Sequence, residues 1–185
     1  LLIALNDISQ RKGLEEELRQ AADYDDLTGL HSRRHFDQAM ESERERAERY
    51  EHPTCLLMID LDRFKDINDR FGHPAGDTYL RRFADTCRKL LRGSDVMGRI
   101  GGDEFAGLLP ETKLEEAREI AERIRQSVEN LRVSNDGQEF GASVSIGVVA
   151  MKPGESVRSA VSRADRALYQ AKAAGRNAVC TGPSI

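Results

Sequence analysis

The most constraining feature of the sequence is an unbroken apolar run from Cys55 to Ile59, preceded by Thr54 and closed by Asp60. A short continuous apolar segment of this kind is typical of a strand that is buried on both faces of a sheet. The run therefore predicts a central strand, with a carboxylate at the point where the strand ends.

Helices are predicted from apolar residues that recur three or four positions apart. The first follows Ser32, a residue type that caps helices well, and ends before Pro53. Its predicted apolar face consists of Phe36, Met40, Ala47 and Tyr50. The same periodicity predicts three more helices, at about residues 76–92, 114–131 and 157–171.

Other short apolar segments predict further strands. Residues 96–100 and 105–109 flank a glycine pair, so they are expected to form a tight hairpin. Residues 143–151 predict another strand, and residues 178–180 predict one at an edge. This order of elements fits an α+β fold with a ferredoxin-like βαββαβ core, in which a mainly antiparallel central sheet is flanked by helices.

Length and charge narrow the class of protein. The 185 residues correspond to one domain with room for a short appendage. The sequence has 28 Lys and Arg and 32 Asp and Glu, so its net charge is slightly negative. The surface as a whole is therefore not the basic patch that nucleic acid requires. The absence of Trp from the sequence also argues against stacking platforms for single strands. We therefore expect no nucleic-acid partner.

Cysteine usage and hydropathy indicate the compartment. The three cysteines, Cys55, Cys87 and Cys180, are far apart and fit buried thiols better than a disulfide framework or a zinc site. No apolar run approaches the roughly 18 to 20 residues that span a bilayer. We expect a cytoplasmic fragment without membrane contact of its own, cut from a longer protein that a membrane could tether.

Residues 1–23 differ in pattern from the rest of the chain. The first nine residues are typical of an apolar strand that runs into a polar turn. Leu14, Leu18 and Ala21 then follow at helical spacing among charged residues. This spacing predicts a short helix with a narrow apolar stripe. Such a helix could either pair weakly with another helix or dock on the domain. We expect two units, an appendage at 1–23 and a domain at 24–185.

Two carboxylates mark the predicted chemistry. Asp60 ends the buried strand, and Asp103 lies in the turn of the hairpin. If the hairpin lies beside that strand, both carboxylates meet at one end of the sheet. Hard oxygen ligands of this kind suit Mg2+, which takes one or two carboxylates together with substrate phosphates. The alternative for Asp60 is a solvated residue at the end of a strand.

Polar side chains gather after Asp60, between residues 60 and 77. Amide and carboxylate groups in this segment can hydrogen-bond the edge of a purine, and Lys65 can hold phosphate together with nearby backbone N–H groups. Lys172 and Arg176 add two cations near the other end of the chain. The alternative for each cation, taken singly, is a solvated surface charge.

The pentapeptide at 101–105 is GGDEF, and the chain resembles the catalytic domain of bacterial diguanylate cyclases, a family named for it. The resemblance covers about residues 24–180 in the family's order. It implies a fold similar to nucleotide cyclase and polymerase palm domains. The supporting segments are YDDLTGLHSRRHF at 24–36, MIDLDRFKDINDRFGHPAGD at 58–77, RGSDVMGRIGGDEF at 92–105, AERIR at 121–125, SIGV at 145–148 and ADRALYQAKAAGRN at 164–177.

The resemblance also implies roles for individual residues. The metal ligands would be Asp60, the backbone carbonyl of Leu61, and Asp103, with Asp103 and Glu104 as catalytic residues. Gly101 and Gly102 would let the substrate approach the hairpin backbone closely. The residues that contact guanine and ribose would be Asn68, His73 and Asp77. The triphosphate would be bound by Lys65, Lys172 and Arg176. An inhibitory site for the product would be formed by Arg92, Asp95 and Arg123.

The implied reaction condenses two GTP molecules into cyclic di-GMP and pyrophosphate, with Mg2+ or Mn2+ as cofactor and a homodimer as the active form. Cyclic di-GMP would also inhibit the enzyme. Two other functions remain open at this point, a catalytically silent receptor for cyclic di-GMP and a GTP-binding regulatory module.

The sequence departs from the family pattern at two places. His31-Ser32 stands where Pro-Asn is usual, and Ile100 stands where an aromatic residue often precedes the glycines. Neither position carries an implied catalytic role. Residues 1–20 resemble the end of a PAS-type sensory domain followed by a signalling helix, which implies that the appendage is a remnant of an upstream sensor.

Overall fold

The structure is a computed structural model that describes residues 23–182. The sensory-domain remnant expected at the N-terminus falls almost wholly on residues 1–22, outside the described residues, and stays a prediction. Within residues 23–182, no helix is long and apolar enough to cross a bilayer.

A six-stranded sheet forms the centre of the fold, in the order β1-β3-β4-β2-β7-β8. The four inner strands pair antiparallel, and the two outer ones pair parallel to their neighbours. The inner order is that of a ferredoxin-like βαββαβ core, which confirms the predicted fold class. The strands are β1 (His31–Ser32), β2 (Thr54–Leu61), β3 (Val96–Arg99), β4 (Glu104–Pro110), β7 (Val144–Ala150) and β8 (Val179–Thr181).

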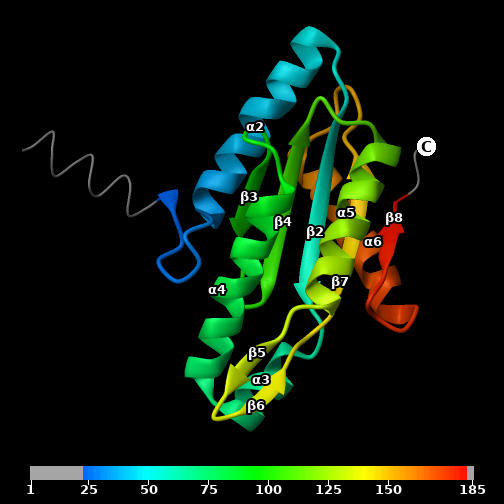
Figure 1. Cartoon of the computed structure of the whole chain (residues 1–185). Coiled ribbons are helices and arrows are strands. Elements are labelled where there is room, and N and C mark those ends of the chain that lie inside the picture. The colour runs from blue at the N-terminus through cyan, green and yellow to red at the C-terminus, as the bar shows by residue number, and fades with distance from the viewer. Residues whose placement is uncertain (1–22, 183–185) are drawn as a thin grey trace, which may run out of the picture.

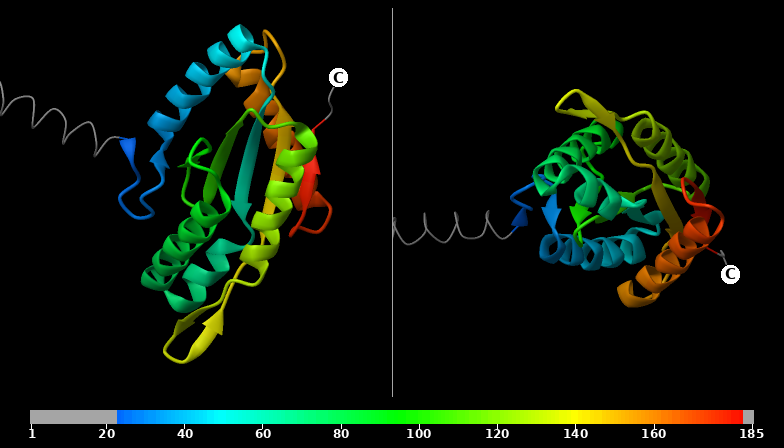
Figure 2. Two further views of the ribbon diagram at one scale, coloured as in Figure 1. Left: turned by 45° about the horizontal axis from the view of Figure 1, so that its top comes forward. Right: turned by 90° about the horizontal axis from the view of Figure 1, so that it is seen from below.

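Helices cover both faces of this sheet (Figures 1 and 2). Helices α4 (His73–Leu90) and α5 (Leu114–Glu129) pack over one face with the larger apolar core. Helices α2 (Arg33–Tyr50) and α6 (Val157–Ala173) pack over the other face with a smaller core. A central strand covered on both sides has to be apolar on both sides, which explains the continuous run in β2.

A small accessory layer lies at one end of the sheet. Helix α3 (Phe64–Phe71) follows β2, and a separate hairpin of β5 (Val133–Asn135) and β6 (Gln138–Phe140) packs near it, with the rings of Phe71 and Phe140 stacked at 4.6 Å. Figure 1 shows this layer below the strand ends. The β5–β6 hairpin was not predicted, because its two strands are only three residues long and carry little apolar pattern.

Two details of the predicted helices were wrong. Helix α4 begins at His73 rather than near Gly76, because Pro74 fits the first turn of a helix and extends it toward the N-terminus. Tyr50 is exposed instead of lying on the apolar face of α2, since the last turn of that helix extends past the sheet (Figure 1). Ser32 caps α2 as predicted, by accepting a hydrogen bond from the His35 N–H at 3.3 Å.

Candidate active site

Three carboxylate residues meet where β2 and β4 lie side by side. Asp60, near the end of β2, is the register partner of Glu104, the first residue of β4. One residue further on, the Leu61 N–H donates a 3.1 Å hydrogen bond to the Asp103 carbonyl oxygen. The GGDEF turn is therefore fixed against the end of the central strand, as the sequence predicted.

Lys172 reaches this group from the opposite end of the chain. Its Nζ lies 2.7 Å from Asp60 Oδ2. The approach depends on close packing of α6 on β7, because a Cβ on Gly147 would collide with backbone atoms of Ala164 and Leu168. Glycine at position 147 thus lets the helix lie close enough to the sheet to bring Lys172 to Asp60.

Opposing effects act on the pKa of Asp60. Burial raises the pKa of this carboxyl group, the hydrogen bond and charge of Lys172 lower it, and Asp103 and Glu104 raise it again, so that the net pKa lies above its ordinary value. The one lysine does not neutralise the negative charge that converges here. The pKa of Asp165, on α6, is also raised, through burial and then through the charge of Glu104.

This donor set fits a hard divalent cation. Asp60 and Asp103 supply carboxylate oxygens, the surplus of negative charge favours a cation, and Mg2+ binds through one or two carboxylates when substrate phosphates complete its shell. In the part of the chain that the structure describes, no group of three or more His, Cys, Asp or Glu side chains is arranged to hold a metal. Any cation held by Asp60 and Asp103 would need further ligands, such as substrate phosphates, to complete its coordination.

The residues assigned to the base lie around the start of α4. Asn68 of α3 faces Gly76 so closely that a Cβ at position 76 would collide with the Asn68 amide oxygen. Asp77, the next residue of α4, is half-buried, whereas His73 is exposed. Lys65 is exposed in the first turn of α3. The structure therefore brings Asn68 close to the turn of α4 that holds Asp77.

Arg176 lies in the turn between α6 and β8. It lines a polar cavity of about 420 Å³ together with Asp62, Arg63 and Arg70. Asp62 is buried and accepts hydrogen bonds from three donors. It had no predicted role, although its position two residues after Asp60 was a usable signal.

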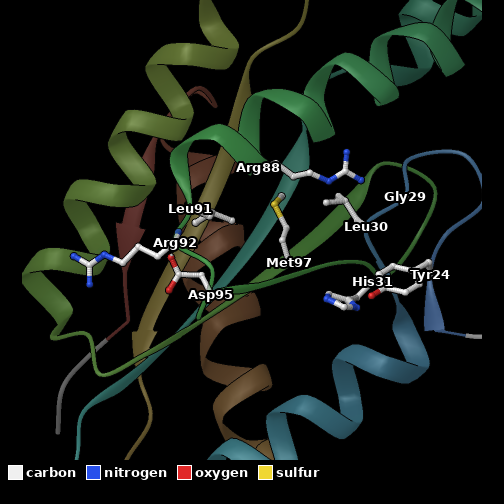
Figure 3. A pocket seen from close by; sticks show the side chains of 9 residues that line it. All are labelled: Tyr24, Gly29, Leu30, His31, Arg88, Leu91, Arg92, Asp95 and Met97. Atoms are coloured by element: carbon white, nitrogen blue, oxygen red, sulfur yellow. Dashed lines mark hydrogen bonds between the residues drawn. The ribbon is translucent and has the colours of Figure 1, made fainter. Parts of the chain in front are cut away.

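The predicted inhibitory residues are only partly brought together. Arg92 and Asp95 line one pocket of about 180 Å³ with Tyr24, His31 and Arg88 (Figure 3). Their contact joins the Arg92 backbone N–H to Asp95 Oδ2 at 2.8 Å, and the Arg92 side chain extends away from the rest of the pocket. Arg123 is exposed on α5 and lines a different surface pocket.

An arginine that the sequence reasoning missed braces the hairpin turn. Arg99 donates two hydrogen bonds to the Gly102 carbonyl oxygen, at 3.2 and 2.8 Å, and pairs with both oxygens of Asp25 at 3.2 and 3.1 Å. Thr28 also binds the Asp25 carboxylate. The GGDEF turn is therefore tied to the segment that enters the domain. Arg99 lies two residues before the glycine pair, a position at which a side chain can reach back to the turn.

Comparisons with known proteins agree with this geometry. The family model described as "Diguanylate cyclase, GGDEF domain" matches residues 22–178. The response regulator PleD of Caulobacter vibrioides is 41% identical in an alignment of 180 positions that covers 92% of this chain and 40% of PleD. The diguanylate cyclase DgcM of Escherichia coli is 41% identical over 179 residues, which are 97% of this chain and 43% of DgcM. The chain thus spans about two fifths of the length of these relatives.

Solved structures show the same fold. The coiled coil and GGDEF domain of DgcB from Caulobacter crescentus, in complex with c-di-GMP, superimposes with a TM-score of 0.93 at 31% identity, covering 98% of this chain and 97% of that one. The diguanylate cyclase SiaD of Pseudomonas aeruginosa, in complex with its activator SiaC, gives a TM-score of 0.86 at 37% identity, covering 97% and 69%. The chain therefore belongs to the GGDEF family of diguanylate cyclases.

Proposed function

We propose that this chain is the catalytic domain of a diguanylate cyclase, which condenses two molecules of GTP into cyclic di-GMP and two of pyrophosphate. The observation that carries the proposal is the meeting of Asp60, Asp103 and Lys172 at the end of β2, in a chain of this family. A protein that only binds the product has no need of this surplus of negative charge next to Lys172, a lysine at a position that binds the substrate triphosphate.

The reaction forms two phosphodiester bonds. The 3'-hydroxyl oxygen of each GTP attacks the α-phosphorus of the other, the bond to the β-phosphate breaks, and pyrophosphate leaves with its electron pair. Such phosphoryl transfer depends mainly on positioning and on neutralisation of charge. Lys172 and Arg176 would bind the triphosphate of the substrate. Asp103 or Glu104 would act as general base and accept the proton that the attacking hydroxyl loses.

Asp60, Asp103 and the Leu61 carbonyl would hold Mg2+, with Mn2+ as a substitute. A bound divalent cation lowers the pKa of a coordinated hydroxyl and stabilises the leaving oxygen. The surroundings of Asp60 support this assignment, because Lys172 alone does not offset the effects of burial and of the charges of Asp103 and Glu104, which raise its pKa.

Asn68 and Asp77 would select guanine. An amide and a carboxylate offer both acceptors and donors to the guanine edge, and a site built on such hydrogen bonds rejects a base that leaves them unpaired. The contact between Asn68 and Gly76 supports this role, since it holds the amide beside the first turn of α4. His73 would add a contact to the ribose or the base, and Lys65 a charge near the phosphates.

A homodimer would complete the active site. One chain supplies one set of these residues and binds one GTP, so two chains have to face each other across a twofold axis for both bonds to form. Gly102 supports this geometry, because it is exposed and a Cβ there would meet no atom within 4 Å, so this side of the turn is open to a molecule from outside the chain.

The test is incubation of the chain with GTP and Mg2+, followed by chromatography of the nucleotides. We expect cyclic di-GMP from the wild type and none above background from Asp103→Asn, which keeps the shape of the side chain but removes its charge. ATP in place of GTP should give little product. Binding of cyclic di-GMP without turnover would instead identify a receptor, and binding of GTP without turnover a regulatory module.

Arg92 and Asp95 would form the product site that inhibits the enzyme. The bond between the Arg92 N–H and Asp95 leaves the guanidinium group extended and available to grip a phosphate or stack on a guanine ring. Arg123 would contribute from α5. Arg92→Ala should weaken binding of cyclic di-GMP, measured by calorimetry, and should relieve inhibition while initial rates with GTP stay close to the wild type. Unchanged affinity and inhibition would refute the site.

A further inference from the structure

The turn that carries Arg176 has an unusual backbone. Gly175, Arg176 and Asn177 all have positive φ, at 113°, 67° and 46°. Residues other than glycine seldom adopt this left-handed conformation, and two in succession persist only where the surroundings hold them. The relevant contacts come from Asp62 on one side of the turn and from α5 on the other.

Asp62 holds the backbone of the turn. Its side chain accepts the Asn177 N–H on Oδ2 at 3.0 Å, the Ser143 hydroxyl on Oδ2 at 2.7 Å and the Ser145 hydroxyl on Oδ1 at 2.7 Å. The residue is only 5% exposed. A buried carboxylate with three donors in fixed directions has little freedom to move. Asp62 therefore joins the turn to β7 and to the end of β2.

Asn177 holds the turn from the other side through its amide group. Its Nδ2 donates to Glu129 Oε1 at 2.7 Å, and its Oδ1 accepts from Arg125 Nη1 at 2.8 Å. Arg125 is itself paired with Glu122 and Glu129 along α5. Only a side chain with one donor and one acceptor can satisfy both partners, since a carboxylate at this position would face Glu129.

We propose that Asp62 and Asn177 are positioning residues, which hold the α6–β8 turn so that Arg176 meets the triphosphate of the substrate. The proposal rests on the proposed function and adds two residues to it. Gly175 and Arg176 are exposed, and the turn contributes little to the core. Lys172 is held separately by Asp60, so loosening the turn displaces Arg176 and leaves the other cation in place. The loss should thus fall on the affinity for GTP.

The test uses Asn177→Asp, which keeps the backbone bond to Asp62 and the size of the side chain but sets a carboxylate against Glu129. We expect the KM for GTP to rise about tenfold while kcat changes less than about twofold, the pattern of a lost ground-state contact. Asn177→Gly, which tolerates the left-handed backbone, should give the same split. Asn130→Asp at the end of α5 is the matched control, because it makes the same change without touching the turn, and its KM should match the wild type.

A second substitution supplies the rescue. In the double variant Asn177→Asp/Glu129→Gln the donor and the acceptor are exchanged, so the pair can form again and the KM should return to within about twofold of the wild type. An unchanged KM in both Asn177 variants, or a fall in kcat alone, would overturn the proposal.

Calorimetry separates this proposal from the function on which it rests. GTP affinity is measured for each variant alongside turnover. A wild type that binds GTP without converting it would refute the cyclase, and the same tenfold loss of affinity in Asn177→Asp would still support the positioning role. A wild type that does not bind GTP would overturn both.

Discussion

Helix α6 carries an ion pair near each end, and the two pairs differ in kind. Near its start, Arg163 binds Glu155 through two nitrogens, at 2.8 and 2.6 Å, and both side chains are less than a tenth exposed. Near its end, Lys172 binds Asp60 through one contact at 2.7 Å, and the lysine is 34% exposed. The same helix therefore contributes to a closed ion pair through Arg163 and to an open one through Lys172.

The two carboxyl groups respond in opposite directions. Burial alone would raise the pKa of Glu155, but hydrogen bonds from Arg163, the Ser159 hydroxyl and the Lys152 N–H outweigh it and bring the pKa to about 2. For Asp60, burial and two acidic neighbours outweigh Lys172, and the pKa is raised. Glu155 is thus saturated with hydrogen-bond donors, whereas Asp60 is left short of positive charge, which a divalent cation would supply.

The largest effect is expected at the open pair. Asp60→Asn should lower the rate of cyclic di-GMP formation about 1,000-fold, because the loss of an anionic metal ligand removes several kcal/mol of transition-state stabilisation. Thermal unfolding should show a protein about as stable as the wild type, because Lys172 offsets only part of the cost of burying the Asp60 carboxylate beside two acidic residues. Asp85→Asn, an exposed carboxylate on α4, is the control. Near-normal turnover of a folded Asp60→Asn protein would show that the Lys172–Asp60 pair does not differ in function from the Arg163–Glu155 pair.

Breaking the closed pair should have the reverse outcome. Glu155→Gln removes the carboxylate charge that pairs with the buried Arg163 guanidinium, and breaking a buried ion pair typically costs about 3 kcal/mol of unfolding free energy. The rate per folded molecule should stay close to the wild type. Glu48→Gln, which breaks an exposed pair with Arg44, should cost about 0.5 kcal/mol or less. Urea unfolding followed by circular dichroism measures both. Equal stabilities of the two variants would show that Glu155 is not structural.

The difference in stability between the wild type and Glu155→Gln should depend on pH. The pKa of Glu155 is lowered on folding, so its contribution to stability is complete above the ordinary value of about 4.5 and is lost as the pH falls toward about 2. The stability gap between the wild type and Glu155→Gln should therefore be constant from pH 7 to 5 and narrow steadily below that. A gap that is the same at pH 7 and pH 3 would contradict the assignment.

The smallest effect is expected from removing the cation of the open pair. Lys172→Met should raise the KM for GTP about tenfold, consistent with the loss of one charge-assisted hydrogen bond to phosphate. The unfolding free energy should change by less than about 1 kcal/mol, because a partly exposed pair contributes little. Steady-state kinetics and urea unfolding on one preparation test both statements. A loss of stability as large as that of Glu155→Gln would mean that Lys172 is structural.

Sequence reasoning succeeded where the signal is local. The apolar run before Asp60 marks a strand covered on both faces, and the glycine pair marks the hairpin turn, so both carboxylates could be placed at one end of the sheet. The roles of individual residues came from the family resemblance, because a lone Lys172 or Arg92 carries no pattern of its own.

The contacts that were missed join distant parts of the chain. Asp62 and Asn177 are separated by 115 positions, and Arg99 and Asp25 by 74. Nothing in the local periodicity distinguishes these polar residues from solvated ones, since their partners are set by the order of strands and by a turn with left-handed residues. Tyr50 shows the opposite error, because an apolar residue at the right spacing was assigned to the core although no sheet lies beneath the last turn of α2.

The short outer strands have a consequence for how copies of this domain can meet. Within residues 23–182, β1 has two residues and β8 has three. A sheet grows when a foreign strand pairs with the free backbone N–H and C=O groups of an edge strand. Edge strands this short offer few such groups. In the proposed homodimer, the two copies would therefore be protected from merging into one continuous sheet. Their encounter would stay reversible, and each pair could separate after turnover.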